Sequence, residues 1–262
     1  MTMRKGALLG QHFLTGTWAA RALARAAGIS PGEEVLEIGP GKGALTKELL
    51  AEGGVVTAIE KDPALVLELH KIFTGEIASK RLMIVEGDIR DFDPESRLKA
   101  GDYVLAANIP YYITGEIIRT FLSSNVHPKT MALLVQKEVA ERILARNGKE
   151  SILSLSVKAY GTPKIVAKVT RGNFSPPPSV DSAILLIEHI SRSFFEHIDE
   201  QKFFRLLHAG FSSKRKKLVN NLRVLADKEV VAMVFKTCAI DLSARAEDLS
   251  LEKWKCLTRE LA

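Results

Sequence analysis

The segment Asn108-Ile109-Pro110-Tyr111-Tyr112 is the part of the sequence best suited to chemistry. An aromatic amine is a weak nucleophile because its lone pair is delocalised into the ring. The Asn108 side-chain oxygen and the Ile109 carbonyl could each accept a hydrogen from such an amine and favour a tetrahedral, reactive nitrogen. Pro110 would hold the carbonyl in place, and Tyr111 would stack on the ring. A strand-ending turn would explain the asparagine and the proline, but it leaves the tyrosines unexplained.

Three features that precede this segment suit a nucleoside-like cofactor. The loop Gly39-Pro40-Gly41-Lys42-Gly43 lets backbone approach a ligand closely, although it could be only a tight turn and it lacks the glycine spacing of a dinucleotide fingerprint. Glu60 could accept hydrogen bonds from two ribose hydroxyls, as it also would in a nicotinamide-dependent oxidoreductase. Asp88 could accept one from an adenine amine, which a nicotinamide enzyme does not require. Either acid alone could be a solvated loop residue.

Short apolar runs alternate with helical patterns up to about residue 188, which predicts an α/β fold with a mostly parallel sheet. We expect strands over 35–38, 55–59, 82–85, 103–107 and 131–135, and helices over 44–50, 63–72 and 116–123. Ligands of open parallel sheets bind at the carboxyl ends of the strands. The glycine loop, Glu60, Asp88 and Asn108 all follow such ends, so their joint placement indicates one ligand site.

The later part of the chain predicts a second domain. Residues 154–160 and 183–187 are expected to be further strands beside a proline-rich loop over 173–178, because prolines cannot lie within a central strand. Beyond residue 190 the apolar spacing becomes helical. We therefore expect an α/β domain over residues 1–190 and a small helical domain over residues 191–262.

Composition and charge limit the possible functions. The 262 residues, 46% of them hydrophobic, can form one large or two modest domains. The formal net charge of +6 comes entirely from the end of the chain, where residues 202–262 contain 13 basic and 7 acidic residues. The basic excess is concentrated at Lys214, Arg215, Lys216 and Lys217. Such a cluster fits a polyanion, although it could also be a solvated helix face.

The two cysteines and the absence of long apolar segments indicate an intracellular protein. Cys238 and Cys256 are too few for a disulfide framework and lack metal-ligand spacing, so we expect packing thiols in a reducing cytoplasm and no bound metal. The sequence offers neither a signal peptide nor a run long enough to span a membrane. We expect a soluble, cytoplasmic and monomeric protein.

Five motifs occur in an order that resembles the ribosomal RNA adenine dimethyltransferases, close to the members that dimethylate two neighbouring adenosines near the 3′ end of 16S rRNA. The resemblance covers about residues 10–261. Its motifs are Gly10-Gln11-His12-Phe13-Leu14, Glu37 to Thr46, Asn108 to Tyr111, Gln136 to Ala140 and Pro176 to Ser182.

The resemblance implies a Rossmann-like class I methyltransferase sheet with S-adenosylmethionine as cofactor, and 16S rRNA in the small subunit or its precursor as partner. It implies catalysis at Asn108, Ile109, Pro110 and Tyr111, base stacking by Tyr111 and Phe174, and rRNA binding by the basic helical domain. The implied donor contacts are His12, Leu14, Gly39, Gly41, Glu60, Asp88 and Asn108.

Two positions depart from the small-subunit pattern. His12 and Tyr112 both stand where those enzymes usually carry asparagine. The macrolide-resistance methyltransferases, which act on 23S rRNA, remain an alternative, although the proline loop and the basic tail favour the small subunit. An RNA-binding ribosome assembly factor with secondary catalysis is a further alternative, which the intact Glu60, Asp88 and Asn108 disfavour.

Overall fold

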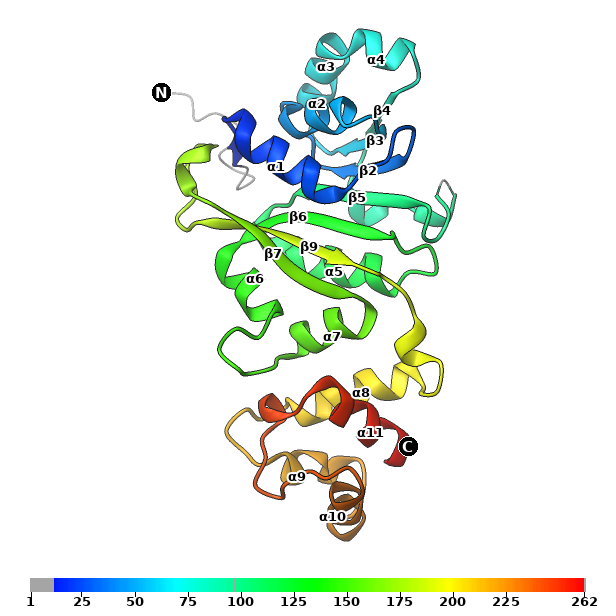
Figure 1. Ribbon diagram of the computed structural model, residues 1–262, viewed down its shortest axis with the longest axis vertical. Helices are drawn as coiled ribbons and strands as arrows, with labels where there is room; N and C mark the ends of the chain where they lie inside the picture. The colour runs from blue at the N-terminus through cyan, green and yellow to red at the C-terminus, as the bar shows by residue number, and fades with distance from the viewer. Residues whose placement is uncertain (1–11, 97, 262) are drawn as a thin grey trace. The chain divides into compact units, whose positions relative to one another are not determined.

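The computed structural model describes residues 12–96 and 98–261. The chain forms two compact units, one from residues 1–140 and 162–190, the other from residues 141–161 and 191–262. Residues 141–161, which we expected in the first domain, therefore belong with the helical part of the chain. Figure 1 shows the first unit in blue to yellow-green and the helices of the second mainly in yellow to red.

A seven-stranded sheet forms the first unit, in the order β4-β3-β2-β5-β6-β9-β7. The first five strands of this order are parallel, whereas β9 and β7 are antiparallel to their neighbours. All five predicted parallel strands are confirmed. The strands are β2 (Glu34–Ile38), β3 (Val55–Glu60), β4 (Leu82–Glu86), β5 (Tyr103–Asn108), β6 (Thr130–Gln136), β7 (Thr162–Val169) and β9 (Ser182–Glu188).

The strand order reverses between β2 and β5, because the chain runs outward from β2 through β3 to β4 and then returns to β5 on the other side of β2. Ligands of such sheets bind at this reversal, beside the carboxyl ends of the strands. The glycine loop follows β2 and Asn108 ends β5. The topology therefore brings the two predicted features to the same place.

Helices cover both faces of this sheet, with α1 on one side and α5 on the other (Figure 1). The residues Val35, Val104 and Leu134 are buried with α1 and α2, and their strand neighbours point to the opposite face because side chains alternate along a strand. The helices of this unit are α1 (Thr17–Ala27), α2 (Ala44–Ala51), α3 (Pro63–Ile72), α4 (Thr74–Ala78) and α5 (Thr114–Ser123), and α6 (Lys137–Ile143) follows β6.

A short second sheet joins two distant segments. Strand β1 (Phe13–Leu14) pairs antiparallel with β8 (Phe174–Ser175). The Thr15 backbone N–H donates to the Asn173 carbonyl at 3.0 Å, which extends the pairing. This pairing places the first described residues of the chain beside the proline loop.

Residues 152–160 form helix α7 (Ile152–Tyr160), so the strand predicted over 154–160 is wrong. Ser151 and Ser154 form a reciprocal capping box that starts the helix. Leu155 and Ala159, four residues apart on one helix face, are buried in the core of the second unit. The short apolar run fitted either structure, and packing against the helical core decides it. The strand predicted over 183–187 is confirmed as β9.

The second unit is helical beyond residue 190, as predicted. Phe203, Leu207, Phe235 and Trp254 form the centre of its core. Its further helices are α8 (Glu200–Gly210), α9 (Leu218–Asn221), α10 (Lys228–Thr237) and α11 (Leu251–Glu260). Among the described residues, short 3-10 helices lie at Ile89–Asp91, Pro94–Ser96, Tyr111–Ile113, Arg171–Asn173, Ser193–Phe195, Leu222–Val224 and Ala246–Asp248.

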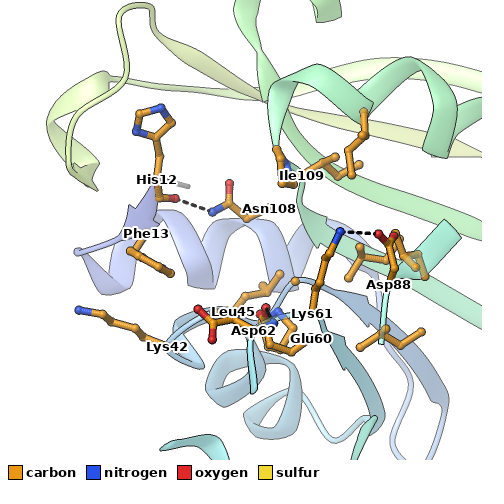
Figure 2. A pocket seen from close by; sticks show the side chains of 18 of the residues that line it. His12, Phe13, Lys42, Leu45, Glu60, Lys61, Asp62, Asp88, Asn108 and Ile109 are labelled. Carbon is orange, nitrogen blue, oxygen red and sulfur yellow. Dashed lines mark hydrogen bonds and ion pairs between the residues drawn. The ribbon is translucent and has the colours of Figure 1, made fainter. Parts of the chain in front are cut away.

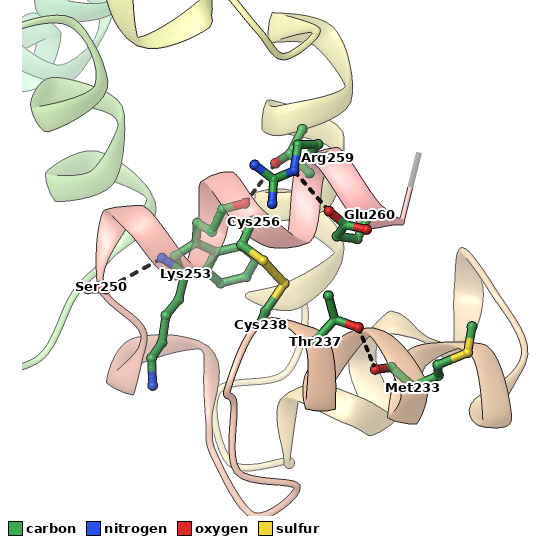
Figure 3. Close-up of a disulfide and its surroundings, with 10 residues drawn as sticks. Met233, Thr237, Cys238, Ser250, Lys253, Cys256, Arg259 and Glu260 are labelled. Carbon is green, nitrogen blue, oxygen red and sulfur yellow. Dashed lines mark hydrogen bonds and ion pairs between the residues drawn. A yellow bond between two sulfur atoms is a disulfide. The ribbon is translucent and has the colours of Figure 1, made fainter.

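Cys238 and Cys256 form a disulfide, so the prediction of two free packing thiols is wrong (Figure 3). Cys238 follows the end of α10, and Cys256 lies within α11. Cys238 is buried in the core of the second unit, and Cys256 packs against that core, which brings the two sulfurs together. Two cysteines 18 positions apart carry no local signal for this contact.

Within residues 12–96 and 98–261, the helices are too short or too polar for any of them to cross a membrane.

Candidate active site

A cavity of about 440 Å³ lies in the first unit at the carboxyl ends of the parallel strands. Its volume lies within the usual range for small-molecule and cofactor sites. Figure 2 shows the glycine-loop and β3 residues on one side and Asn108 with His12 on the other. The predicted site residues that line it are His12, Leu14, Gly39, Gly41, Glu60, Asp88, Asn108, Ile109, Pro110 and Tyr111. Gly10 and Gln11 of the first motif lie outside the described residues.

The glycine loop turns tightly between β2 and α2. Gly41 and Gly43 have positive φ angles of 59° and 78°. A Cβ at Gly41 would lie 3.0 Å from the Phe13 ring, and one at Gly43 would lie 2.5 Å from Phe73. The loop therefore requires glycine for both its backbone conformation and its close packing, and Gly39 and Gly41 form part of the cavity wall.

Glu60 ties this loop to the end of β3. Its side chain is buried, one carboxylate oxygen accepts from the Gly41 N–H at 3.0 Å, and the other accepts from the Asp62 N–H at 2.9 Å. A carboxylate oxygen can accept two hydrogen bonds. Each oxygen of Glu60 therefore keeps one acceptor position for a ligand hydroxyl, which fits the predicted ribose contact.

Asp88 lies beside two cations that the sequence analysis did not single out. One oxygen accepts from the Arg90 backbone N–H and Nε, both at 3.0 Å, and the other accepts from Arg90 Nη2 at 2.6 Å and Lys61 Nζ at 2.9 Å. Hydrogen bonds from Arg90 first, and then from Lys61, hold the pKa of Asp88 well below its usual range. The four acceptor positions of this carboxylate are thus filled.

Asn108 has its amide oriented by a distant part of the chain. Its Nδ2 donates to the His12 carbonyl at 3.0 Å, which leaves Oδ1 as the acceptor for a ligand (Figure 2). Tyr111 follows in a 3-10 helix, and its hydroxyl is hydrogen-bonded to Ser182 Oγ at 2.8 Å. Partial burial raises the pKa of Tyr111, although the Ser182 bond opposes this. The tyrosine is therefore held in place as a neutral aromatic wall.

Glu37 is a buried acid beneath the glycine loop that the sequence analysis treated only as part of a motif. It is completely buried on β2, and its two oxygens have no hydrogen-bond partner among the residues that the structure describes. Burial, reinforced by the nearby Glu60 charge, raises the pKa of Glu37 to about 8 despite its contact with Thr46. The carboxyl is therefore mainly protonated at neutral pH.

The remaining predicted residues lie elsewhere. Phe174 is 4% exposed and packs in the hydrophobic core, outside the described cavity wall. The cluster Lys214 to Lys217 is an exposed segment of the second unit before α9. The buried Asn221, which the sequence analysis missed, donates to the carbonyls of Gly210 at 2.6 Å and Ser213 at 3.0 Å. These bonds anchor the segment that carries the basic cluster.

Comparison with known proteins identifies the family. The model of the family "Ribosomal RNA adenine dimethylase" matches residues 3–262. A ribosomal RNA small subunit methyltransferase A from Dehalococcoides mccartyi strain CBDB1 is 42% identical, over 99% of this chain and 88% of the relative. A protein of the same name from Moorella thermoacetica is 38% identical, over 96% of this chain and 91% of the relative.

Solved structures agree with this assignment. A dimethyladenosine transferase from Plasmodium falciparum matches with a TM-score of 0.81 and 28% identity, over 94% of this chain and 96% of the other. The 23S rRNA methyltransferase ErmE matches with a TM-score of 0.76 and 25% identity, over 95% of this chain and 99% of the other. The predicted class I methyltransferase fold is thus confirmed, and the chain belongs to the ribosomal RNA adenine dimethylases, a family of S-adenosylmethionine-dependent enzymes.

Proposed function

We propose that this protein uses S-adenosylmethionine to dimethylate the N6 amines of two adjacent adenosines near the 3′ end of 16S rRNA. The observation that supports this proposal best is the orientation of the Asn108 amide. Its nitrogen is committed to the His12 carbonyl, so its oxygen is available at the wall of a cavity that also contains Glu60 and Tyr111. An acceptor fixed beside a nucleoside-sized pocket suits an incoming aromatic amine.

The donor half of the cavity fits S-adenosylmethionine. Glu60 keeps an acceptor position on each oxygen for the ribose hydroxyls, and Gly39 lines the cavity with open space where a side chain would otherwise stand. Asp88 is placed for the adenine amine, but it can accept that hydrogen only when one of its present cationic partners moves away. The cofactor supplies an electrophilic methyl group on a positively charged sulfur.

The other half of the cavity would handle the target adenine. Asn108 Oδ1 and the Ile109 carbonyl accept the two amine hydrogens and turn the nitrogen lone pair toward the methyl group, while Tyr111 supports the flipped base. Transfer forms a nitrogen–carbon bond and breaks the carbon–sulfur bond, whose electrons remain on sulfur. The amine becomes acidic as its new bond forms, so water can take the released proton. Alignment of the amine with the methyl group then lowers the activation barrier by on the order of several kcal/mol.

Two features support an rRNA substrate in the small subunit. The relatives at 42% and 38% identity carry a small-subunit name, whereas the 23S rRNA methyltransferase ErmE is 25% identical. The exposed Lys214 to Lys217 segment suits contact with RNA phosphates. We propose that residues 191–262 contribute this contact, and that the protein acts as a monomer in the cytoplasm.

The test uses ribosomal subunits from cells that lack this enzyme. Purified protein, S-adenosylmethionine and either small or large subunits are incubated, and dimethyladenosine positions are mapped by mass spectrometry of RNA fragments. We expect two adjacent dimethyladenosines near the 3′ end of 16S rRNA. Modification of 23S rRNA alone would assign the protein to the macrolide-resistance type of activity, and no modification of either RNA would overturn the proposal.

A further inference from the structure

The disulfide of the second unit closes a covalent ring over residues 238–256. Cys238 follows the end of α10, and Cys256 lies within α11, so the segment between the two cysteines is tied at both ends (Figure 3). The chain contains two cysteines, and both are used in this bond. A cross-link of this kind limits the conformations that the enclosed segment can adopt.

The disulfide-closed ring contacts the chain just before the basic cluster Lys214 to Lys217. The side chain of Trp254 stacks on Phe211, with ring centroids 5.7 Å apart and ring planes inclined by 21°. A Cβ at Gly210, the last residue of α8, would lie 2.4 Å from the Trp254 ring, so the missing side chain permits this close contact. Trp254 lies two residues before Cys256 and is completely buried. The position of α11 therefore determines where the basic cluster begins.

The same ring holds the chain just after the basic cluster. The Leu218 backbone N–H donates to the Ala244 carbonyl at 2.8 Å. Leu218 is the first residue of α9, where an N–H has no partner within its own helix. Ala244 lies in the segment between Cys238 and Cys256. Residues 212–217 thus run between two contacts with the disulfide-closed ring.

The two cysteines differ in exposure. Cys238 is 7% exposed, whereas Cys256 is half-buried, so a thiol can approach more easily from the Cys256 side. A thiolate reduces a disulfide by attacking one sulfur and releasing the other as a thiolate. A dithiol would bond to the Cys256 sulfur, release Cys238 and then close on itself as a cyclic disulfide. Two electrons pass to the protein, and both dithiol protons end on the cysteine sulfurs.

We propose that the Cys238–Cys256 disulfide is a reversible redox control of RNA binding by the basic cluster Lys214 to Lys217. This inference rests on the proposed function, in which the cluster contacts rRNA phosphates, and it adds the regulation of that contact. In the disulfide form the ring holds both ends of the cluster, so less conformational freedom is lost when RNA binds. In the dithiol form the ring is open, the cluster is less ordered and RNA binding is weaker. Thiols therefore lower the affinity for RNA, and oxidation restores it.

The test compares the disulfide form of the wild-type protein with the same protein after treatment with dithiothreitol. KM and kcat are measured with unmodified small subunits, and the donor Kd is measured by calorimetry with S-adenosylmethionine. We expect the KM for subunits to rise about threefold to tenfold on reduction, as for the ordering of one long side chain. It should recover after reoxidation with oxidised glutathione. The donor cavity lies in the first unit, so kcat and the donor Kd should not change.

Two variants show whether the effect passes through the bond and the cluster. The double variant Cys238→Ala, Cys256→Ala should have the raised KM with or without dithiothreitol. A variant with alanine at all four positions of the cluster, Lys214 to Lys217, should have a raised KM in both redox forms and no response to reduction. A response that persists in this second variant would contradict the assigned route.

Equal KM values for the two redox forms of the wild type would overturn the inference alone. Circular dichroism of the reduced protein should keep the helical signal of the disulfide form. Loss of that signal would make the bond a support of the fold rather than a control, which also overturns the inference. Failure of both redox forms to modify the subunits would overturn the proposed function, and the inference with it.

Discussion

The cavity has a donor half, formed by Gly41, Glu60 and Asp88, and a base half, formed by Asn108, Ile109 and Tyr111. The two halves differ in how far apart in the sequence their hydrogen-bonded residues lie. The bonds that organise the donor half join residues 19 positions apart for Gly41 and Glu60, and 27 apart for Lys61 and Asp88. Those of the base half span 96 positions from His12 to Asn108 and 164 from His12 to Pro176. The donor half is thus built by neighbouring strand ends, whereas the base half depends on the β1–β8 pairing. We expect the two halves to fail separately.

The largest effect is expected at the base half, from Asn108→Ala. Loss of the amide oxygen removes an interaction that strengthens as the amine becomes tetrahedral, so the rate of transfer should fall by about 10²–10³-fold. Single-turnover transfer to small subunits measures this rate, and calorimetry measures the donor Kd, which should change far less. Asn125→Ala, at an exposed asparagine, is the matched control. A donor Kd that worsens as much as the rate would show that the halves are not separable.

Glu60→Gln should have the opposite effect, because it should change the donor Kd more than the rate of methyl transfer. The amide can accept from only one of the two backbone N–H groups, so the other is left facing an NH₂ group and the glycine loop loses an anchor. We expect the donor Kd to rise about tenfold to hundredfold, as for loss of a hydrogen bond to a buried charge. Calorimetry with the exposed Glu68→Gln as control tests this. Wild-type donor affinity in Glu60→Gln would refute the assigned ribose contact.

Glu37 makes the stability of the donor half depend on pH. Its pKa is about 8 in the folded protein, above the ordinary value of 4.5, so the folded state retains a proton that the unfolded chain has lost between these values. Stability should therefore fall as the pH rises from about 5 to 8, by about 4 kcal/mol at most from this group.

Denaturant unfolding of the wild type and of Glu37→Gln at several pH values measures this contribution. The neutral glutamine cannot ionise, so the variant should lose less stability than the wild type across the same pH interval. Parallel pH profiles for the two proteins would show that Glu37 does not retain its proton.

Lys61→Met should give the smallest change, and in the direction of tighter binding. Lys61 is one of the cations that fill the acceptor positions of Asp88, and its side chain is 62% exposed. Removing it frees one position for the donor adenine amine, so we expect the donor Kd to fall about twofold to fivefold, within the range of one exposed ion pair. Weaker donor binding in this variant would show that Lys61 contacts the cofactor directly.

The same contrast explains how much the sequence could predict. The glycine loop, Glu60 and Asp88 follow predicted parallel strands, and the rule that ligands bind at strand ends places them together without further information. The sequence could not predict that all four acceptor positions of Asp88 are occupied, because this depends on the directions of the Lys61 and Arg90 side chains. The hydrogen bond between His12 and Asn108 depends on β1 and β8, two strands of two residues each that carry no periodic signal.

Outside the site, packing decides what local patterns leave open. Helix α7 and a buried strand share the same short apolar run, and only the core formed with Phe203 distinguishes them. Strand β7 was not predicted, because the exposed Val166 between Ile165 and Ala167 breaks the alternation of apolar and polar residues in this edge strand. The disulfide between Cys238 and Cys256 follows from the packing of α11 against α10.

The decisive measurement is a crystal structure with S-adenosylhomocysteine and adenosine monophosphate bound together. The N6 amine of the target adenine should lie about 3 Å from both Asn108 Oδ1 and the Ile109 carbonyl and should point at the donor sulfur. An adenine bound elsewhere, or an Asn108 oxygen turned away from the amine, would contradict it.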